Sequence, residues 1–159
     1  MNVGHDGTMF SLHASDPRDA VARLEVLATA ANPTLPLLAA REQMASALNL
    51  IVHVERLRDG SRKVVRVTEV QGMQGDVVML ADIFVYEQTG MESDNGDKKI
   101  TGRFAATGQI PKILKSIQEA GIQLPTDFFP APSGGLIKIS SSSCGRGLLG
   151  TGGFTVGCN

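Results

Sequence analysis

The sequence contains no apolar run long enough to cross a membrane. A spanning helix needs about 18–20 apolar residues, and the longest run, from Val77 to Tyr86, is interrupted by Asp82. The first residues also lack the basic and apolar regions of a signal peptide. These absences predict a cytoplasmic chain without a transmembrane segment.

Cysteine is scarce, and neither charge sign dominates. Cys144 and Cys158 are the only cysteines among 159 residues, too few for a disulfide framework or a structural zinc site. We therefore expect free thiols and no metal. The 15 basic and 16 acidic residues nearly cancel and form no basic stripe, so nucleic acid is not the expected partner. The rest of the composition, 42% hydrophobic and 19% charged, fits one globular domain.

A phosphate-binding loop is also missing. Gly145 and Gly150 have the spacing of G-x-x-x-x-G-K-[ST], but Thr151 stands where the lysine is required. The same stretch matches the dinucleotide fingerprint G-x-G-x-x-G. That fingerprint needs a preceding strand, a following helix and an acidic residue about 20 positions on, and the chain ends at Asn159. We interpret the match as a coincidence of a glycine-rich sequence.

Residues 16–129 carry helix and strand patterns. Asp16 is an N-cap with Pro17 at the first helical position, and apolar residues recur at helical spacing until Asn32-Pro33. The pattern then predicts a helix over 36–48, strands near 50–55 and 64–70 joined by a turn at Asp59-Gly60, a strand over 77–86, a polar loop or hairpin tip at 91–99, a short strand over 100–106 and a helix over 111–120. These elements predict one α/β unit covering residues 1–129.

Composition changes sharply after Pro130. Glycine and serine crowd the segment, which offers little apolar surface to offset its backbone entropy. We predict that residues 130–159 form a separate, mostly disordered tail.

Two histidines, His5 and His13, lie in a glycine-rich and hydroxyl-rich segment just before the first helix. Phe10-Ser11-Leu12 reads as a short buried strand, and His13 follows at its end. Open α/β sheets place ligands at the ends of buried strands. This position favours a ligand-facing role for His13 and, within the same segment, for His5.

The segment resembles the histidine box of the ATPases that drive type II and type IV secretion and pilus assembly. The resemblance is to the CpaF/TadA type, which powers tight-adherence (Flp) pili, and it runs colinearly through residues 1–129. It is carried by stretches that include Ser15-Asp16-Pro17-Arg18-Asp19-Ala20, Arg56-Leu57-Arg58-Asp59-Gly60-Ser61-Arg62, Thr68-Glu69-Val70, Asp82-Ile83-Phe84 and Gly121-Ile122-Gln123-Leu124-Pro125. The tail has no counterpart in that resemblance.

The resemblance implies the C-terminal portion of a RecA-like P-loop ATPase domain, assembled as a hexameric ring that uses ATP and Mg. It implies that His5 and His13 sense the γ-phosphate, since an imidazole can hydrogen-bond both phosphate and carboxylate. It also implies inner-membrane platform proteins as partners and a location at the cytoplasmic face of the inner membrane. The phosphate loop and catalytic glutamate of the family lie before the box and are absent here, so we expect no cofactor and no ATP hydrolysis for this chain alone.

Other readings remain open from the sequence. The chain could be a fragment of the secretion ATPase, a non-catalytic interaction module of the secretion machinery, or a gene remnant. We expect Arg18, Arg23 and Arg41 to be surface or interface residues rather than catalytic ones. We also expect residues 1–15 to be poorly ordered, because the short strand at 10–12 lacks its neighbours in a RecA-like sheet.

Overall fold

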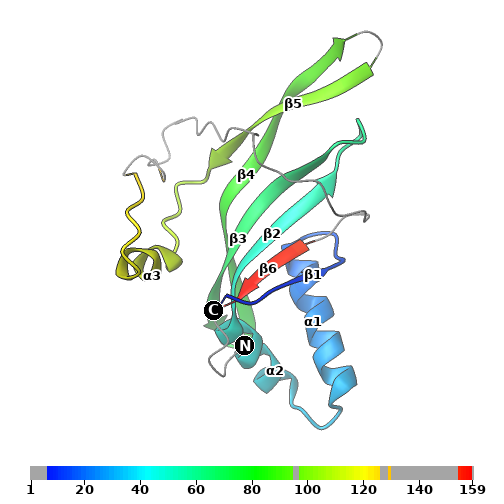
Figure 1. Cartoon of the computed structure of the whole chain (residues 1–159). Helices are drawn as coiled ribbons and strands as arrows, with labels where there is room; N and C mark the ends of the chain where they lie inside the picture. Colours follow the sequence, from blue (N-terminus) through cyan, green and yellow to red (C-terminus); the bar gives the residue numbers. More distant parts are fainter. Residues whose placement is uncertain (1–6, 95–96, 126–128, 130–153, 159) are drawn as a thin grey trace.

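The computed structural model describes residues 7–94, 97–125, 129 and 154–158. Its elements in chain order are β1 (Met9–Leu12), α1 (Pro17–Ala31), α2 (Leu37–Ala47), β2 (Leu48–Arg56), β3 (Arg62–Gln74), β4 (Val77–Asp94), β5 (Asp97–Ala106), α3 (Ile113–Glu119) and β6 (Phe154–Cys158). The strands form one sheet in the order β1-β6-β2-β3-β4-β5 (Figure 1). The helices and the β2–β3 hairpin lie where the sequence pattern predicts them.

All strand pairs between described residues are antiparallel. The strands β2, β3, β4 and β5 pair as neighbours in sequence order, and we call these four strands the meander. A RecA-like domain has a parallel sheet, and the described strands show no parallel pair. The assignment of the chain to that fold therefore stays a prediction.

The main core lies between the sheet and the helices α1 and α2. Its buried members are Val21, Leu48, Ile51, Val70 and Val78, with Leu24 and Met44 packed beside them. Ile51 is fully buried. The apolar stripe of each helix therefore meets the face of the meander that Ile51 occupies, and we call this the helix face.

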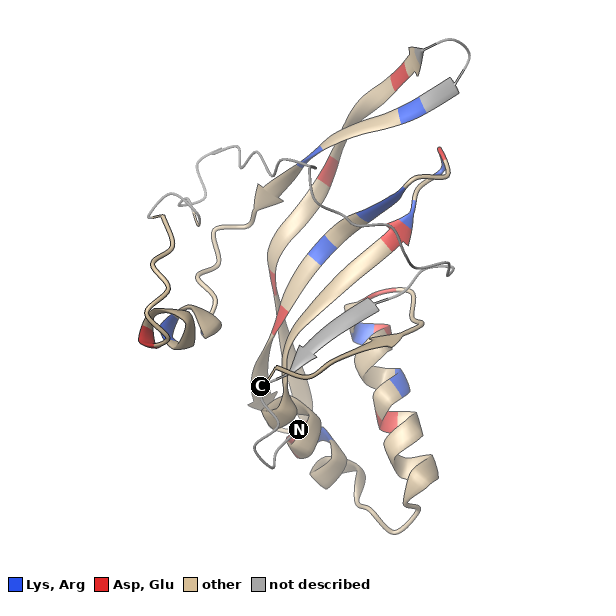
Figure 2. Ribbon diagram, viewed as in Figure 1, with Lys and Arg blue, Asp and Glu red and all other residues tan. Residues whose placement is uncertain are grey.

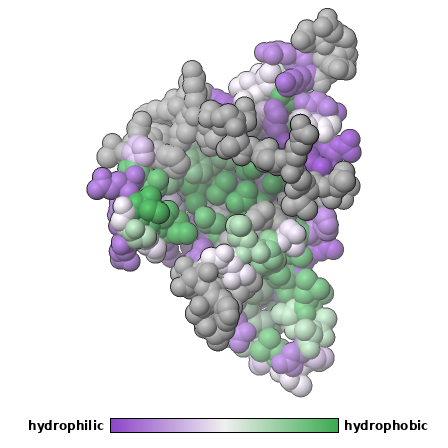
Figure 3. Space-filling view, viewed as in Figure 1, coloured by the Kyte–Doolittle hydropathy of each residue, from purple (hydrophilic) through white to green (hydrophobic). Residues whose placement is uncertain are grey.

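The opposite face of the meander is covered in part by α3 and by aromatic rings. Phe84 stacks on Phe104 and on Phe129, with ring centroids 5.7 Å apart in each pair. The backbone N–H of Ile113, at the start of α3, donates to Glu69 Oε1 at 3.0 Å. Figure 3 shows hydrophobic surface gathered over the sheet beside α3 and along α1. The meander is thus packed on both faces.

The prediction of a disordered tail is wrong for residues 154–158. These five residues form β6, which lies between β1 and β2 and pairs with both. Hydrogen bonding on two sides compensates for the entropy lost on ordering so short a segment. Residues 130–153 and 159 lie outside the described residues.

The expectation for the N-terminal segment also needs correction. β1 is not left without a neighbour, because Met9 to Leu12 pair with Gly157 to Phe154 of the same chain. Residues 1–6 lie outside the described residues. The strand at 10–12 therefore obtains its partner from the C-terminal end of the chain.

Candidate functional site

The histidine segment, residues 13–16, connects β1 to α1 and is fixed by hydrogen bonds at the helix start. The side chain of Asp16 caps α1 by accepting from the Asp19 N–H at 2.8 Å, and Asp19 Oδ2 accepts from the Ser15 N–H at 2.8 Å. The first bond satisfies a donor that the first helical turn would leave open, and the second fixes the residue before the N-cap. The sequence prediction of an Asp16 N-cap is confirmed.

His13 is exposed, and its backbone is held by the helix that follows. The guanidinium of Arg23 donates to the carbonyl oxygen of His13. Arg23 therefore positions the backbone of the histidine while leaving the imidazole at the surface. His5 lies outside the described residues, so the structure places only one of the two predicted site histidines.

A polar cavity of about 150 Å³ lies beneath the first turn of α1. The helix contributes Asp16, Pro17 and Arg18, and the helix face of the sheet contributes Arg66, Thr68, Leu80 and Asp82. Within it, Thr68 Oγ1 donates to Asp82 Oδ1 at 2.7 Å, and Arg66 Nη1 lies 3.4 Å from Asp82 Oδ2. Asp82 thus organises the floor of the cavity.

His53 is the third histidine, and it lies on β2 opposite Arg66 of β3. It is 7% exposed. Burial lowers the pKa of His53 below its ordinary value, and the attraction of Glu55 opposes this more strongly than the repulsion of Arg66 supports it. A lowered pKa keeps the imidazole neutral near pH 7, where it can both donate and accept a hydrogen bond.

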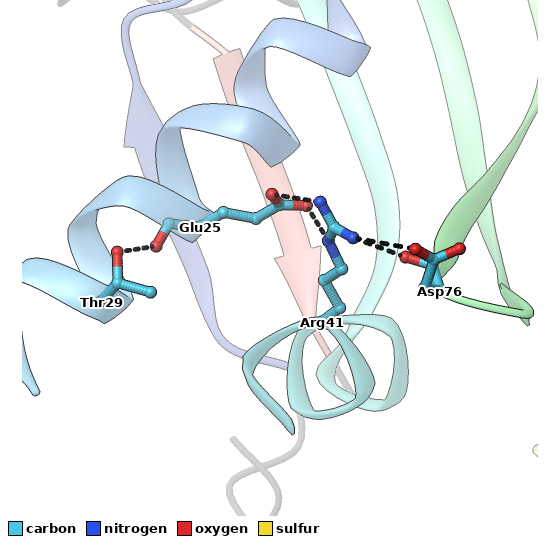
Figure 4. A network of polar contacts seen from close by, with 4 residues as sticks. All are labelled: Glu25, Thr29, Arg41 and Asp76. Carbon is cyan, nitrogen blue, oxygen red and sulfur yellow. Dashed lines mark hydrogen bonds and ion pairs between the residues drawn. The ribbon is translucent and has the colours of Figure 1, made fainter. Parts of the chain in front are cut away.

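The three arginines expected at the surface have different surroundings. Arg18 is exposed and lines the cavity, and Arg23 is exposed but bonded to His13. Arg41 is largely covered. Its Nε and Nη2 donate to the two carboxylate oxygens of Glu25 at 2.9 and 3.1 Å, and its Nη1 donates to the carbonyl oxygen of Asp76 at 2.8 Å (Figure 4).

Arg41 therefore clamps α1, α2 and the β3–β4 turn together. Its side chain is 24% exposed, so it is partly covered rather than a free surface residue, and the two-pronged pair with a carboxylate uses its guanidinium inside the protein. The expectation of an interface rather than a catalytic role stays a prediction. Hydrogen bonding to Glu25 raises the pKa of Arg41, so the clamp stays charged.

Sequence reasoning did not identify the cavity residues as a group. Arg66 and Thr68 alternate along β3 with Val67 and Glu69, so the polar pair shares one face. That alternation was a usable signal that the two polar residues share a face of β3. The apolar residues between them, however, suggested that the other face of the strand was the buried one. Within the ranges that the structure describes, no group of three or more His, Cys, Asp or Glu side chains could hold a metal ion.

The cavity and the histidine segment together form the candidate site. The cavity combines guanidinium, hydroxyl and carboxylate groups beside a histidine segment that leads straight into a capped helix.

None of the helices within the described ranges is long and apolar enough to cross a membrane.

Comparison with known proteins finds two relatives named for conjugal transfer. It is 31% identical over 77 residues to two proteins of Mycobacterium tuberculosis, from strains CDC 1551 / Oshkosh and ATCC 25618 / H37Rv, each named "Putative conjugal transfer protein". The match covers 48% of this chain and 21% of each relative. The chain thus spans about a fifth of the length of the curated relatives it matches. No protein-family model matches the chain.

Proposed function

We propose that this chain is part of a CpaF/TadA-type secretion ATPase, which couples ATP hydrolysis to protein secretion or pilus extrusion. The observation that carries the proposal is the match to proteins named for conjugal transfer. The position of His13, between a paired strand and a capped helix, supports it. The proposal includes a RecA-like fold for the ATPase domain to which the chain would contribute.

His13 acts in this proposal as the group that senses the γ-phosphate. Arg23 holds the backbone of His13 from the second turn of α1, so a change of contact at the imidazole would be passed to the helix. His5 is proposed for the same role through the family resemblance alone. Phosphoryl transfer needs a phosphate loop, its lysine and Mg²⁺, and this sequence contains no such loop.

The family resemblance adds partners and location to the proposal. They are a homo-hexameric ring, ATP and Mg in the complete enzyme, and platform proteins at the cytoplasmic face of the inner membrane. The second candidate function is a non-catalytic interaction module of the same machinery. The charge at the tip of the β2–β3 hairpin favours that reading, since Arg56, Arg58 and Arg62 are all exposed there.

The test uses two proteins. The purified chain alone should release no phosphate from MgATP above the rate of a blank. A chimera in which this chain replaces the matching segment of a Mycobacterium tuberculosis relative should hydrolyse ATP. His13→Ala in that chimera should then lower kcat by roughly a hundredfold, the loss typical of a group that stabilises transition-state charge.

Ser11→Ala is the matched control, because Ser11 is exposed on the adjacent strand. It should leave kcat unchanged. An assembled, active chimera that keeps full turnover after His13→Ala would contradict the sensing role. A chimera that assembles without any activity would favour the interaction module.

A further inference from the structure

Three arginines gather at the tip of the β2–β3 hairpin. Arg56 and Arg62 are directly opposite each other in the register, and Arg58 lies in the turn between them. All three are exposed. Figure 2 shows the positive residues near this end of the hairpin. Like charges directly opposite each other in an antiparallel pair destabilise it.

Two acidic residues lie near this arginine tip, Glu55 beside Arg56 and Asp59 in the turn, but neither forms an ion pair with a tip arginine. The ion pairs between described residues involve Arg41, Arg66 and Arg103, and none involves a tip arginine. Asp59, in the middle of the turn, points its oxygens inward. Its Oδ1 accepts from the N–H and hydroxyl of Ser61 at 2.9 and 2.6 Å, and its Oδ2 accepts from the Ile100 N–H at 2.8 Å.

The turn that carries the arginines is internally fixed. Leu57 N–H donates to the Ser61 carbonyl at 2.8 Å, and Gly60 N–H donates to the Leu57 carbonyl at 2.9 Å. Gly60 has a φ of +81°, a conformation that glycine adopts without strain. Lys63, one residue beyond Arg62, donates to the Tyr86 hydroxyl at 2.8 Å and to the Ile100 carbonyl at 2.7 Å. The tip is thus tied to β4 and β5 before any partner arrives.

We propose that the arginine tip is a docking surface for an acidic segment of a partner protein. A guanidinium offers a planar fork of donors that matches a carboxylate. The pre-formed turn keeps the like charges of the three arginines close together. An acidic segment that binds there removes their repulsion, and little conformational entropy is lost because the turn is already ordered. This surface is separate from the histidine segment and does not depend on the proposed ATPase role.

Membranes and nucleic acids fit the tip less well. Leu57, the apolar residue of the turn, is 6% exposed, so the turn offers no apolar anchor to a lipid surface. Single-stranded nucleic acid requires aromatic rings for base stacking. The tip itself, residues 56–62, contains no aromatic residue.

Binding of a fluorescently labelled hexaglutamate peptide to the full chain tests the proposal. The triple variant Arg56→Gln, Arg58→Gln, Arg62→Gln should weaken binding about tenfold, as expected for three exposed charge pairs. The matched control is Arg18→Gln, Arg103→Gln, Lys115→Gln. It removes the same charge from exposed positions elsewhere and should bind like the unmodified chain.

Thermal unfolding separates a binding role from a structural one. The tip variant should melt no lower than the unmodified chain, because it removes a repulsion and no internal bond. Equal loss of peptide binding in the tip variant and the control would overturn the proposal. So would binding to vesicles of phosphatidylserine and phosphatidylcholine, lost in the tip variant, without binding to hexaglutamate.

Discussion

The meander and the β1–β6 pair are built in opposite ways. In the meander, each strand pairs with its neighbour in sequence, and helices or aromatic rings cover both faces. β1 and β6 come from the two ends of the chain, and β1 has no other strand partner among the described elements. Local pairing requires little loop-closure entropy, whereas pairing of chain ends requires much more.

The difference bears directly on the histidine segment. His13 follows β1, and β1 is joined to the rest of the sheet through β6. On its other side the segment is held by the cap of α1 and by Arg23. We therefore expect the meander to be more stable than the part that positions His13, so that the two can be perturbed separately.

The largest loss of stability is expected from truncating a core side chain of the meander. Ile51→Ala removes a fully buried side chain under α1 and should lower the free energy of unfolding by about 3 kcal/mol. Phe10→Ala, in β1, should cost less because Phe10 is only partly buried. Urea unfolding of both variants measures this, and equal losses would remove the distinction between the two regions.

A smaller loss is expected from Gly102→Ala in β5. An added Cβ would lie 2.5 Å from the Tyr86 ring and from the Glu87 carbonyl oxygen. Tyr86 would have to move, which would disturb its contact with Lys63, whose ammonium lies 5.0 Å from the ring centroid. We expect a cost of about 1–3 kcal/mol in unfolding free energy. Gly90→Ala is the control, since its nearest neighbour is a side chain at 3.5 Å.

The smallest effect concerns the pH dependence of the hairpin turn. Hydrogen bonds, first from the Ser61 hydroxyl and then from the Ile100 and Ser61 N–H groups, lower the pKa of Asp59 from 3.8 to about 2. A lowered carboxyl pKa stabilises the fold above the unfolded value, and this contribution is lost as pH falls from about 4 to about 2. Melting temperatures of the unmodified chain and Asp59→Asn should therefore converge over that range. A constant difference down to pH 2 would contradict the assignment, and Glu42→Gln provides an exposed control.

The local elements were predictable because their signals are local. Asp16-Pro17 marks the start of α1, and Asp59-Gly60 marks the hairpin turn. The buried face of β2 was not predictable from alternation. Leu50, Val52 and Val54 suggested one inward face, but Ile51 and His53 are the more deeply buried residues. When both faces of a strand are covered, a two-residue period does not identify which one meets the helices.

The candidate site was predicted only in part. His13 lies where the sequence places it, at the end of a strand before a capped helix. The cavity required Arg66, Thr68 and Asp82 to meet Asp16 and Arg18 across the fold, and no sequence spacing encodes that contact. The role of β6 was missed because its short β-prone run sits in a glycine-rich tail, and its two partners lie far away in sequence.

Hydrogen exchange of the full chain with and without Val156→Pro tests the central claim most directly. Residue 156 pairs with Phe10 of β1 and Ile51 of β2, and proline removes the backbone donor of a central strand. We expect the amides at residues 10–12 to exchange much faster in the variant, while those of β3 and β4 stay protected. Unchanged exchange at residues 10–12, or equal loss of protection in β3 and β4, would contradict it.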